Sequence, residues 1–436
     1  MQTRALPGFR DFYPDDLALR SHIFRTWRAV AARYGFEEYD GPPLEPLELY
    51  TAKSGDEIVG QLYAFTDKGG REVALRPEMT PTLARMASAR ANGLPKPIRW
   101  FSVPQLFRYE RHQRGRLREH FQLNCDLIGE PGPLADAEII ALAVDVVRAF
   151  GLTAQDVRVR LSDRRVLSAL LVAGGVAADR LGAAYQAIDK SERMARNDLA
   201  ALLADAGLPP AAIDEVFRIG SLRGWDAVQE AVAAAGVQEA ASPLGATIDA
   251  LGTMGLGEFI DVDFTIVRGL AYYTGTVFEL FDAGGSLRAI CGGGRYDTLL
   301  AGLGGVDLPA LGFGMGDVVL AELLRDRGLV PSPSGSIEVF VAGVTPEDQP
   351  HVLALVHELR DAGLRCEFAF GGQGVGKQLK LAGARGARFA VVLGPDERKK
   401  GEVMVRDLNR KSQQAVARRE VVRMLAAAAA PEGQER

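Results

Sequence analysis

The sequence predicts an α+β fold: an antiparallel sheet with helices, a helical insertion, and a C-terminal α/β domain. Three observations indicate this. Strand-like segments dominate between residues 72 and 128. Alanine-rich segments with helical spacing replace them between about residues 162 and 254. Beyond a proline- and serine-rich stretch, short strands and helices alternate from residue 337 to 425, which is typical of a compact α/β unit.

The first domain is expected at residues 1–325, with the helical insertion at about 162–254. Its first helix is predicted over residues 20–34, where apolar side chains recur at helical spacing until Gly35. Another helix is predicted to begin near Asp317, after a run of glycines. The strands of this domain are expected at 72–75, 98–103, 106–110, 120–128, 263–281 and 288–291.

A linker is predicted at 326–336, the C-terminal domain at 337–425, and a flexible tail at 426–436. The whole chain carries a net charge of −5, yet its C-terminal part is basic. Between Gly376 and Arg423 there are 13 basic and 5 acidic side chains. Such a run is typical of either a solvated face or a contact with nucleic acid.

The composition is that of an ordinary soluble globular protein. Of the 436 residues, 47% are hydrophobic and 25% are charged, which argues against global disorder. No apolar run reaches the roughly 18 residues of a membrane span, and the N-terminus does not resemble a secretory signal. Three widely separated cysteines favour neither a disulfide framework nor a cysteine-based metal site. We therefore expect a cytoplasmic protein with no membrane partner and no metal bound by its own residues.

Polar side chains alternate with apolar ones along the predicted strand 120–128. Gln122, Asn124 and Asp126 lie on one face, opposite a face of apolar residues that includes Leu123 and Leu127. The polar face is either exposed to water or lines a polar ligand pocket.

Cations gather just before this strand. Arg108 and Glu110 share a face, and the following connection contains Arg111, Arg114, Arg116 and Arg118. Such a connection either confers solubility or binds phosphate, since the planar arginine fork suits phosphate oxygens.

Two other segments combine residue types suited to a ligand site. Glu78 and Thr80 lie at a predicted strand-to-helix turn, where they either cap the helix or bind a ligand. The segment from Arg268 to Tyr273 joins a cation, a glycine and the aromatic pair Tyr272 and Tyr273.

Together these segments resemble the histidyl-tRNA synthetases, a family of class II aminoacyl-tRNA synthetases, over nearly the whole chain. The segments that carry the resemblance are 107–110 with the arginine-rich loop (motif 2), 34–36 running into Pro42 (the dimer-forming motif 1), 267–273 and 293–297 (specific to the family) and 386–394 (its anticodon-binding domain).

The resemblance implies an enzyme that activates histidine with ATP and transfers it to tRNA(His), working as a homodimer with Mg2+. It implies that Arg108 and Arg268 act on the α-phosphate as catalytic residues. It further implies that ATP is bound by Arg108, Glu110 and Arg116, and histidine by Glu78, Thr80, Gln122, Asp126, Tyr272 and Tyr273.

The chain departs from the family in motif 3, where Val319 stands in place of the arginine that grips the γ-phosphate. Losing such a donor costs on the order of 2–4 kcal/mol if nothing replaces it. Arg111 or Arg116 would then have to hold the pyrophosphate end. Ala271 likewise stands where an aspartate is common in the family.

Two other functions remain open from the sequence. One is a non-catalytic paralogue that binds histidine and regulates ATP phosphoribosyltransferase, which the absent motif 3 arginine favours. The retained Arg108, Glu110 and Arg268, and the C-terminal domain, count against it. The other is an RNA-binding scaffold without nucleotide chemistry.

Overall fold

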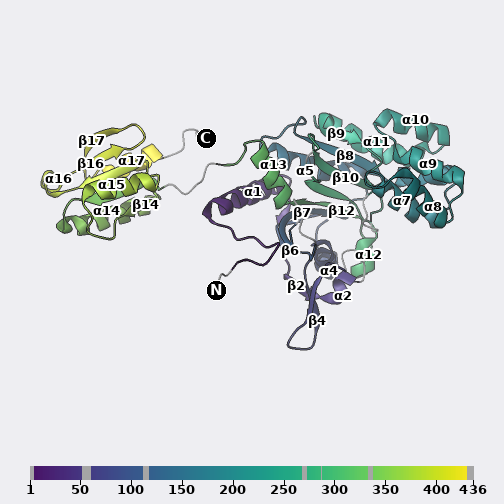
Figure 1. Ribbon diagram of the computed structural model, residues 1–436, viewed down its shortest axis with the longest axis horizontal. Coiled ribbons are helices and arrows are strands. Elements are labelled where there is room, and N and C mark those ends of the chain that lie inside the picture. Colours follow the sequence, from purple (N-terminus) through teal and green to yellow (C-terminus); the bar gives the residue numbers. More distant parts are fainter. Residues whose placement is uncertain are drawn as a thin grey trace. The chain divides into compact units, whose positions relative to one another are not determined.

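The computed structural model describes residues 4–51, 60–110, 117–267, 273–285, 287–331 and 337–429. It divides into two compact units, Met1–Val330 and Pro331–Arg436, each with its own hydrophobic core (Figure 1). None of the helices in the described ranges combines the length and the apolar character needed to cross a membrane.

A nine-stranded sheet, counted over the described residues, forms the centre of the first unit. Neighbouring strands are antiparallel except for the two outermost pairs, β1 with β5 and β8 with β9, which are parallel. The predicted antiparallel sheet is therefore confirmed. The strands, in spatial order, are β1 (Glu37–Glu38), β5 (Ile98–Ser102), β7 (Glu119–Ile128), β12 (Ala310–Gly316), β11 (Cys291–Arg295), β10 (Thr276–Asp282), β8 (Val157–Asp163) and β9 (Ile260–Val262), with β6 (Gln105–Phe107) paired to one end of β7.

Three helices cover one face of this sheet: α1 (Pro14–Arg33), α5 (Pro133–Arg148) and α13 (Asp317–Asp326) (Figure 1). Their apolar sides join the sheet in one core, to which α5 contributes most of its length. Helix α1 begins six residues before the predicted start. Pro14 at its first position and two aspartates in its first turn favour a helix N-terminus there.

The opposite side of the sheet carries smaller elements. A three-stranded sheet, β2 (Leu44–Pro46), β4 (Glu72–Leu75) and β3 (Tyr63–Thr66), lies with the short helix α2 (Leu47–Thr51) and with α4 (Thr80–Arg90) (Figure 1). Helix α12 (Leu299–Gly304) packs against α4. These elements leave a cavity over the central strands.

The insertion between β8 and β9 is helical in the part of the chain described. Asp163, the last residue of β8, caps the first of these helices by accepting a hydrogen bond from the backbone N–H of Arg165. The helices are α6 (Arg164–Ala173), α7 (Leu181–Lys190), α8 (Arg196–Asp205), α9 (Pro210–Gly220), α10 (Trp225–Ala235) and α11 (Gln238–Thr253).

Several predicted strands are wrong in their bounds. The expected strand 106–110 ends at Phe107, and the glycines before Asp317, where no strand is predicted, lie inside β12. A Cβ atom at Gly312 would lie 2.2 Å from a carboxylate oxygen of Asp126, and one at Gly293 would lie 2.3 Å from the carbonyl of Gly312. β11 and β12 therefore require glycine at these positions, because a side chain there would collide with the neighbouring strand.

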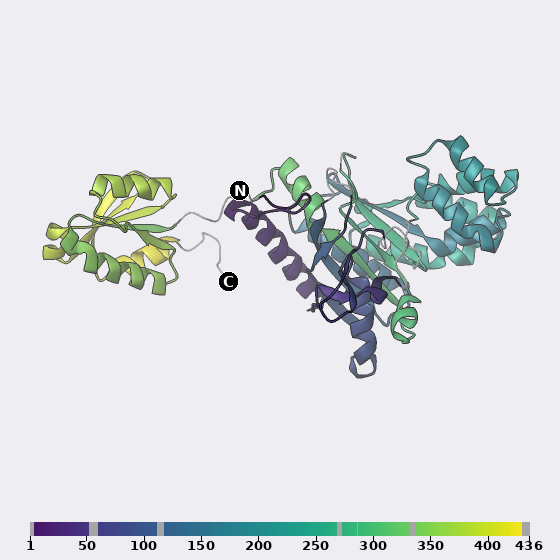
Figure 2. The ribbon, with the colours of Figure 1, turned by 60° about the horizontal axis from the view of Figure 1, so that its bottom comes forward.

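The second unit contains a mixed sheet with helices on both faces (Figure 2). Helices α14 (Gln349–Asp361) and α17 (Val421–Ala429) pack on one face, and α15 (Val375–Ala384) packs on the other. Residues 426–429 thus belong to a helix and not to the predicted tail, because their alanines pack against the core. The strands, in spatial order, are β14 (Cys366–Phe368), β13 (Val339–Gly343), β15 (Phe389–Leu393), β16 (Glu402–Asp407) and β17 (Ser412–Ala417).

Candidate active site

A cavity of about 810 Å³ lies over β7, β12, β11 and β10, on the face of the sheet that α1 and α5 leave open. Its size is in the range typical of sites for small ligands. Seven predicted site residues line it: Glu78, Thr80, Arg108, Glu110, Gln122, Asp126 and Tyr273. The remaining predicted site residues, Arg116, Arg268 and Tyr272, lie outside the described residues.

The polar face of β7 forms the floor of the cavity. Gln122, Asn124 and Asp126 face the cavity, while Leu123 and Leu127 on the other face are buried in the core with α1 and α5. The pairing of β7 between β5 and β12 fixes this orientation, because a shift of one residue would exchange the two faces. Of the two interpretations of this face, the polar pocket is therefore correct.

Asp126 lies at the buried end of this row and is 4% exposed. Its carboxylate accepts a hydrogen bond from the hydroxyl of Tyr296, the residue that follows β11. Burial raises the pKa of Asp126 to about 7, although the hydrogen bond from Tyr296 acts to lower it. A carboxyl group with such a pKa can gain or lose a proton near neutral pH. Tyr273, which is also buried, lines the same cavity.

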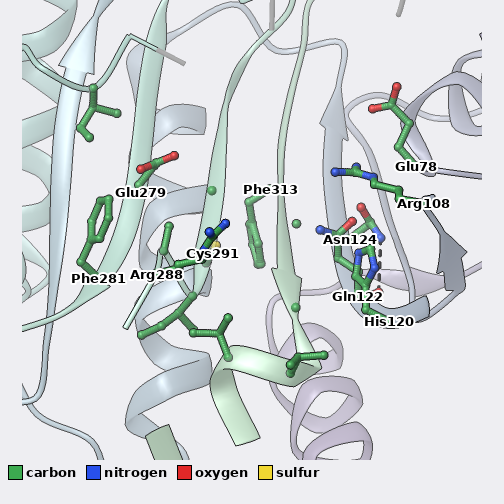
Figure 3. Close-up of a pocket in the computed structure, with 18 of the residues that line it drawn as sticks. Glu78, Arg108, His120, Gln122, Asn124, Glu279, Phe281, Arg288, Cys291 and Phe313 are labelled. Atoms are coloured by element: carbon green, nitrogen blue, oxygen red, sulfur yellow. Dashed lines mark hydrogen bonds between the residues drawn. The ribbon is translucent and has the colours of Figure 1, made fainter. Parts of the chain in front are cut away.

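A strand-to-helix turn presents Glu78 and Thr80. The buried guanidinium of Arg76 holds this turn, since it contacts the carboxylate of Asp40 at 2.7 Å and donates to the carbonyl of Gly41 at 2.8 Å. Arg108 Nε donates to the carbonyl of Pro77 at 2.9 Å. Glu78 and Arg108 therefore lie on one wall of the cavity, beside the β7 residues (Figure 3).

His120 lines the cavity next to Gln122 and was missed by the sequence analysis (Figure 3). Burial and the nearby charges of Arg108 and Arg10 lower the pKa of His120 to about 3, so its imidazole is neutral at physiological pH. The signal was present in the sequence. His120 continues the alternation of Gln122, Asn124 and Asp126 by one more step of two residues.

The motif 3 departure lies on the cavity wall. Val319, 8% exposed, lies in the first turn of α13 and lines the cavity with Val318. Asp317 begins this helix, where its carboxylate lies 2.9 Å from Arg10 Nη1 and accepts a hydrogen bond from the N–H of Phe121 at 2.9 Å. Asp317 thus fixes α13 against β7, and the apolar position that follows faces the ligand space.

The segment 293–297 supplies a structural ion pair as well as Tyr296. Arg295 is 1% exposed and its Nη2 lies 2.8 Å from Asp136 Oδ2 on α5. The same guanidinium donates to the carbonyls of Glu130 and Gly132. Arg295 therefore binds the sheet to α5, whereas the next residue, Tyr296, reaches Asp126, a division of roles that the sequence alone did not reveal.

No group of three or more His, Cys, Asp or Glu side chains that could hold a metal ion occurs in the described ranges. Magnesium that accompanies a nucleotide needs no such group, since phosphates and water supply most of its ligands. Glu279 on β10 is a carboxylate that projects into the cavity and fits the role of a protein ligand to such an ion (Figure 3).

An antiparallel sheet that carries a motif 2 hairpin and a motif 3 helix around a polar cavity defines a class II aminoacyl-tRNA synthetase. Residues 8–317 match the sequence model of histidyl-tRNA synthetase, and residues 338–428 match that of an anticodon-binding domain. The chain belongs to the histidyl-tRNA synthetase family.

Individual relatives agree with this assignment. The chain is 48% identical to the histidine–tRNA ligase of Opitutus terrae over 97% of this chain and 98% of that protein. It is 40% identical to the chloroplastic/mitochondrial histidine–tRNA ligase of Arabidopsis thaliana over 92% and 82% of the two chains.

Solved structures share the fold. The histidyl-tRNA synthetase of Nostoc superposes with a TM-score of 0.82 at 25% identity, covering 98% of this chain and all of that one. A Bacillus halodurans protein described as ATP phosphoribosyltransferase regulatory subunit/histidyl-tRNA synthetase gives 0.74 at 22% identity, covering 90% and 98%. The second likeness concerns the fold alone.

Proposed function

We propose that this chain is a histidine–tRNA ligase, which converts histidine and ATP to histidyl-adenylate and pyrophosphate and then transfers the histidyl group to the 3′ end of tRNA(His). The observation that carries the proposal is the buried pair of Asp126 and Tyr296 at one end of a cavity that has Arg108 on its wall. Such a cavity can hold an imidazole in a polar, desolvated place and a phosphate beside a cation.

The imidazole of histidine would bind against Asp126 and Tyr273. The Asp126 carboxylate accepts an N–H, and the hydroxyl of Tyr273 contacts the other ring nitrogen. A buried acceptor of this kind discriminates strongly, since an apolar ligand side chain in place of the imidazole would not supply the hydrogen bond that the imidazole N–H donates to the carboxylate in addition to that from Tyr296. The α-amino group of histidine, a cation, would bind to oxygen atoms of Glu78, Thr80 and Gln122. Tyr272 would be a further histidine-binding residue.

ATP would lie with its α-phosphate near Arg108 and its adenine amino group near Glu110. A carboxylate oxygen of histidine attacks the α-phosphorus, the bond from that phosphorus to the bridging oxygen breaks, and pyrophosphate leaves with the electron pair. This in-line displacement needs position and positive charge and no covalent nucleophile on the protein. Arg108 and Arg268 would stabilise the charge that develops on the α-phosphate, and Arg116 would contact the leaving phosphates.

Magnesium would enter with the ATP phosphates, and Glu279, a carboxylate that lines the cavity, would contact the ion. The ion, when bound, neutralises part of the charge on the leaving pyrophosphate. The surrounding residues keep the phosphate chain in place.

The second unit would bind the anticodon region of the tRNA. Its match to an anticodon-binding domain and its excess of basic side chains between 376 and 423 support this role. The proposal also includes a homodimer, supported by the motif 1 resemblance of the segment after α1, and a cytoplasmic location. Sedimentation of the purified chain tests the dimer.

The regulatory alternative receives no support from the relatives, which are named as ligases. Purified protein separates the two functions in one assay. The ligase incorporates labelled pyrophosphate into ATP only when histidine is present, whereas a regulatory paralogue binds histidine without exchange.

A further inference from the structure

We propose that Arg288 binds the β- and γ-phosphates of ATP. It would thereby take over the role of the motif 3 arginine, in whose place this chain has Val319. This inference rests on the proposed function, because it adds Arg288 to Arg116 as a group that holds the pyrophosphate end in the same cavity.

The strand register places Arg288 beside the motif 3 position. Cys291 pairs with Met315, and the N–H of Gly316 donates to the carbonyl of Ile290 at 3.2 Å. The chain before Cys291 therefore runs past the end of β12, where α13 begins. Arg288 and Val319 both line the cavity.

The side chain of Arg288 is directed into the cavity. Figure 3 shows Arg288 on the side of the cavity where Glu279 and Cys291 lie, while Arg108 lies with Gln122 and Asn124 on the other side of Phe313. Adenylate formation has two centres of negative charge, the α-phosphate and the departing pyrophosphate. Two arginines on separate walls suit these two centres, and the planar fork of each can bind a pair of phosphate oxygens.

The surroundings of Arg288 fit a phosphate chain with its ion. Glu279 lies in the same part of the cavity, where a carboxylate can contact Mg2+ while the guanidinium contacts phosphate oxygens (Figure 3). Among the described residues, the other cavity-lining cation besides Arg108 is Arg193. It lines the cavity with Asp189 and Glu192, whose negative charges disfavour a polyphosphate there.

The first experiment compares nucleotides that differ only in the phosphates concerned. ATP and AMP are titrated into the wild-type protein and into Arg288→Ala, and histidine is titrated as a test of folding. We expect Arg288→Ala to weaken ATP binding at least tenfold, to leave AMP and histidine binding within about twofold, and to slow histidine-dependent pyrophosphate exchange about 100-fold. Arg288→Lys keeps the charge but not the planar fork of the guanidinium. Its ATP affinity and its exchange rate should lie between those of wild type and Arg288→Ala.

A matched control is Arg71→Ala, which removes an exposed arginine that pairs with Asp67 on the β3–β4 turn and does not line the cavity. It should behave as wild type. The inference is overturned if Arg288→Ala binds ATP as wild type does, or if it loses AMP binding to the same extent as ATP binding. Absence of exchange in the wild-type protein would instead refute the proposed function, so the two failures are distinguishable.

A second experiment restores an arginine at the motif 3 position. Val319→Arg is made in the wild-type protein and in Arg288→Ala. If both positions serve the same phosphates, Val319→Arg should increase exchange at least tenfold more in the Arg288→Ala background than in the wild type, since neighbouring groups on one ligand are not additive. Equal effects in the two backgrounds would contradict the inference.

Discussion

The hydroxyl of Tyr296 donates a hydrogen bond to the carboxylate of Asp126, at the buried end of a cavity formed by strands far apart in the sequence. This hydrogen bond acts to lower the pKa of Asp126, but burial has the larger effect and raises the pKa to about 7. The proposed imidazole site is thus built around a carboxyl group whose charge changes in the physiological range, next to a tyrosine that keeps it in one orientation.

Histidine affinity should follow the ionisation of Asp126. The ionised carboxylate accepts the imidazole N–H, and at pH 6 only about one tenth of a group with a pKa near 7 is ionised, which weakens apparent binding about tenfold relative to pH 8. Calorimetric titration of wild type and Asp126→Asn across this range checks it. The ratio of the two affinities cancels the titration of free histidine, and a ratio that stays constant with pH would contradict the assignment.

In the absence of ligand, the ionised carboxylate of Asp126 should destabilise the folded protein. The folded-state pKa of Asp126 is raised to about 7 from 3.8, so the folded protein binds the extra proton and loses stability as pH rises from about 4 to 7. Asp126→Asn should therefore raise the free energy of unfolding at pH 8, by at most about 4 kcal/mol, and change it little at pH 4. Urea unfolding at the two pH values measures this difference, and an equal effect at both would show that Asp126 does not titrate in this range.

Breaking the buried ion pair of Arg295 and Asp136 should lower the free energy of unfolding more than breaking an exposed ion pair does. Arg295→Ala leaves the Asp136 carboxylate buried without its cation, which costs about 3–5 kcal/mol. Removal of the exposed pair of Arg28 and Glu38 should cost less than about 1 kcal/mol. Denaturant midpoints of the two variants test the contrast. Similar midpoints would mean that Arg295 does not hold the sheet to α5.

The two units should divide the two steps of the reaction. A chain that ends at Val330 keeps the first unit with its own core and cavity, so it should retain pyrophosphate exchange within about threefold. It should lose most of its efficiency in charging tRNA(His), because the basic unit is absent. Exchange and charging are measured on the same preparation, and normal charging by the truncated chain would refute the tRNA-binding role of the second unit.

Much of this site could be predicted from residue patterns. The period of two along 120–128 placed Gln122, Asn124 and Asp126 on one face, and a half-buried strand leaves little freedom in that respect. The helical insertion and the α/β alternation after residue 337 follow equally local rules.

Other features depend on distant partners and could not be read from local patterns. The glycines of β11 and β12 lie outside the predicted strands, because glycine has a low strand propensity and only the neighbouring strand and the Asp126 side chain explain why it is needed there. Arg295 and Tyr296 are adjacent in sequence, yet one side chain is buried against α5 and the other reaches β7, which only the sheet order determines. Arg288 had no motif to mark it.

Histidine-dependent ATP–pyrophosphate exchange by the purified wild-type chain tests the central claim most directly. We expect exchange that requires histidine, is not supported by other amino acids, and proceeds although Val319 occupies the motif 3 position. Histidine binding without any exchange would contradict the ligase function and leave a histidine-binding protein without catalysis.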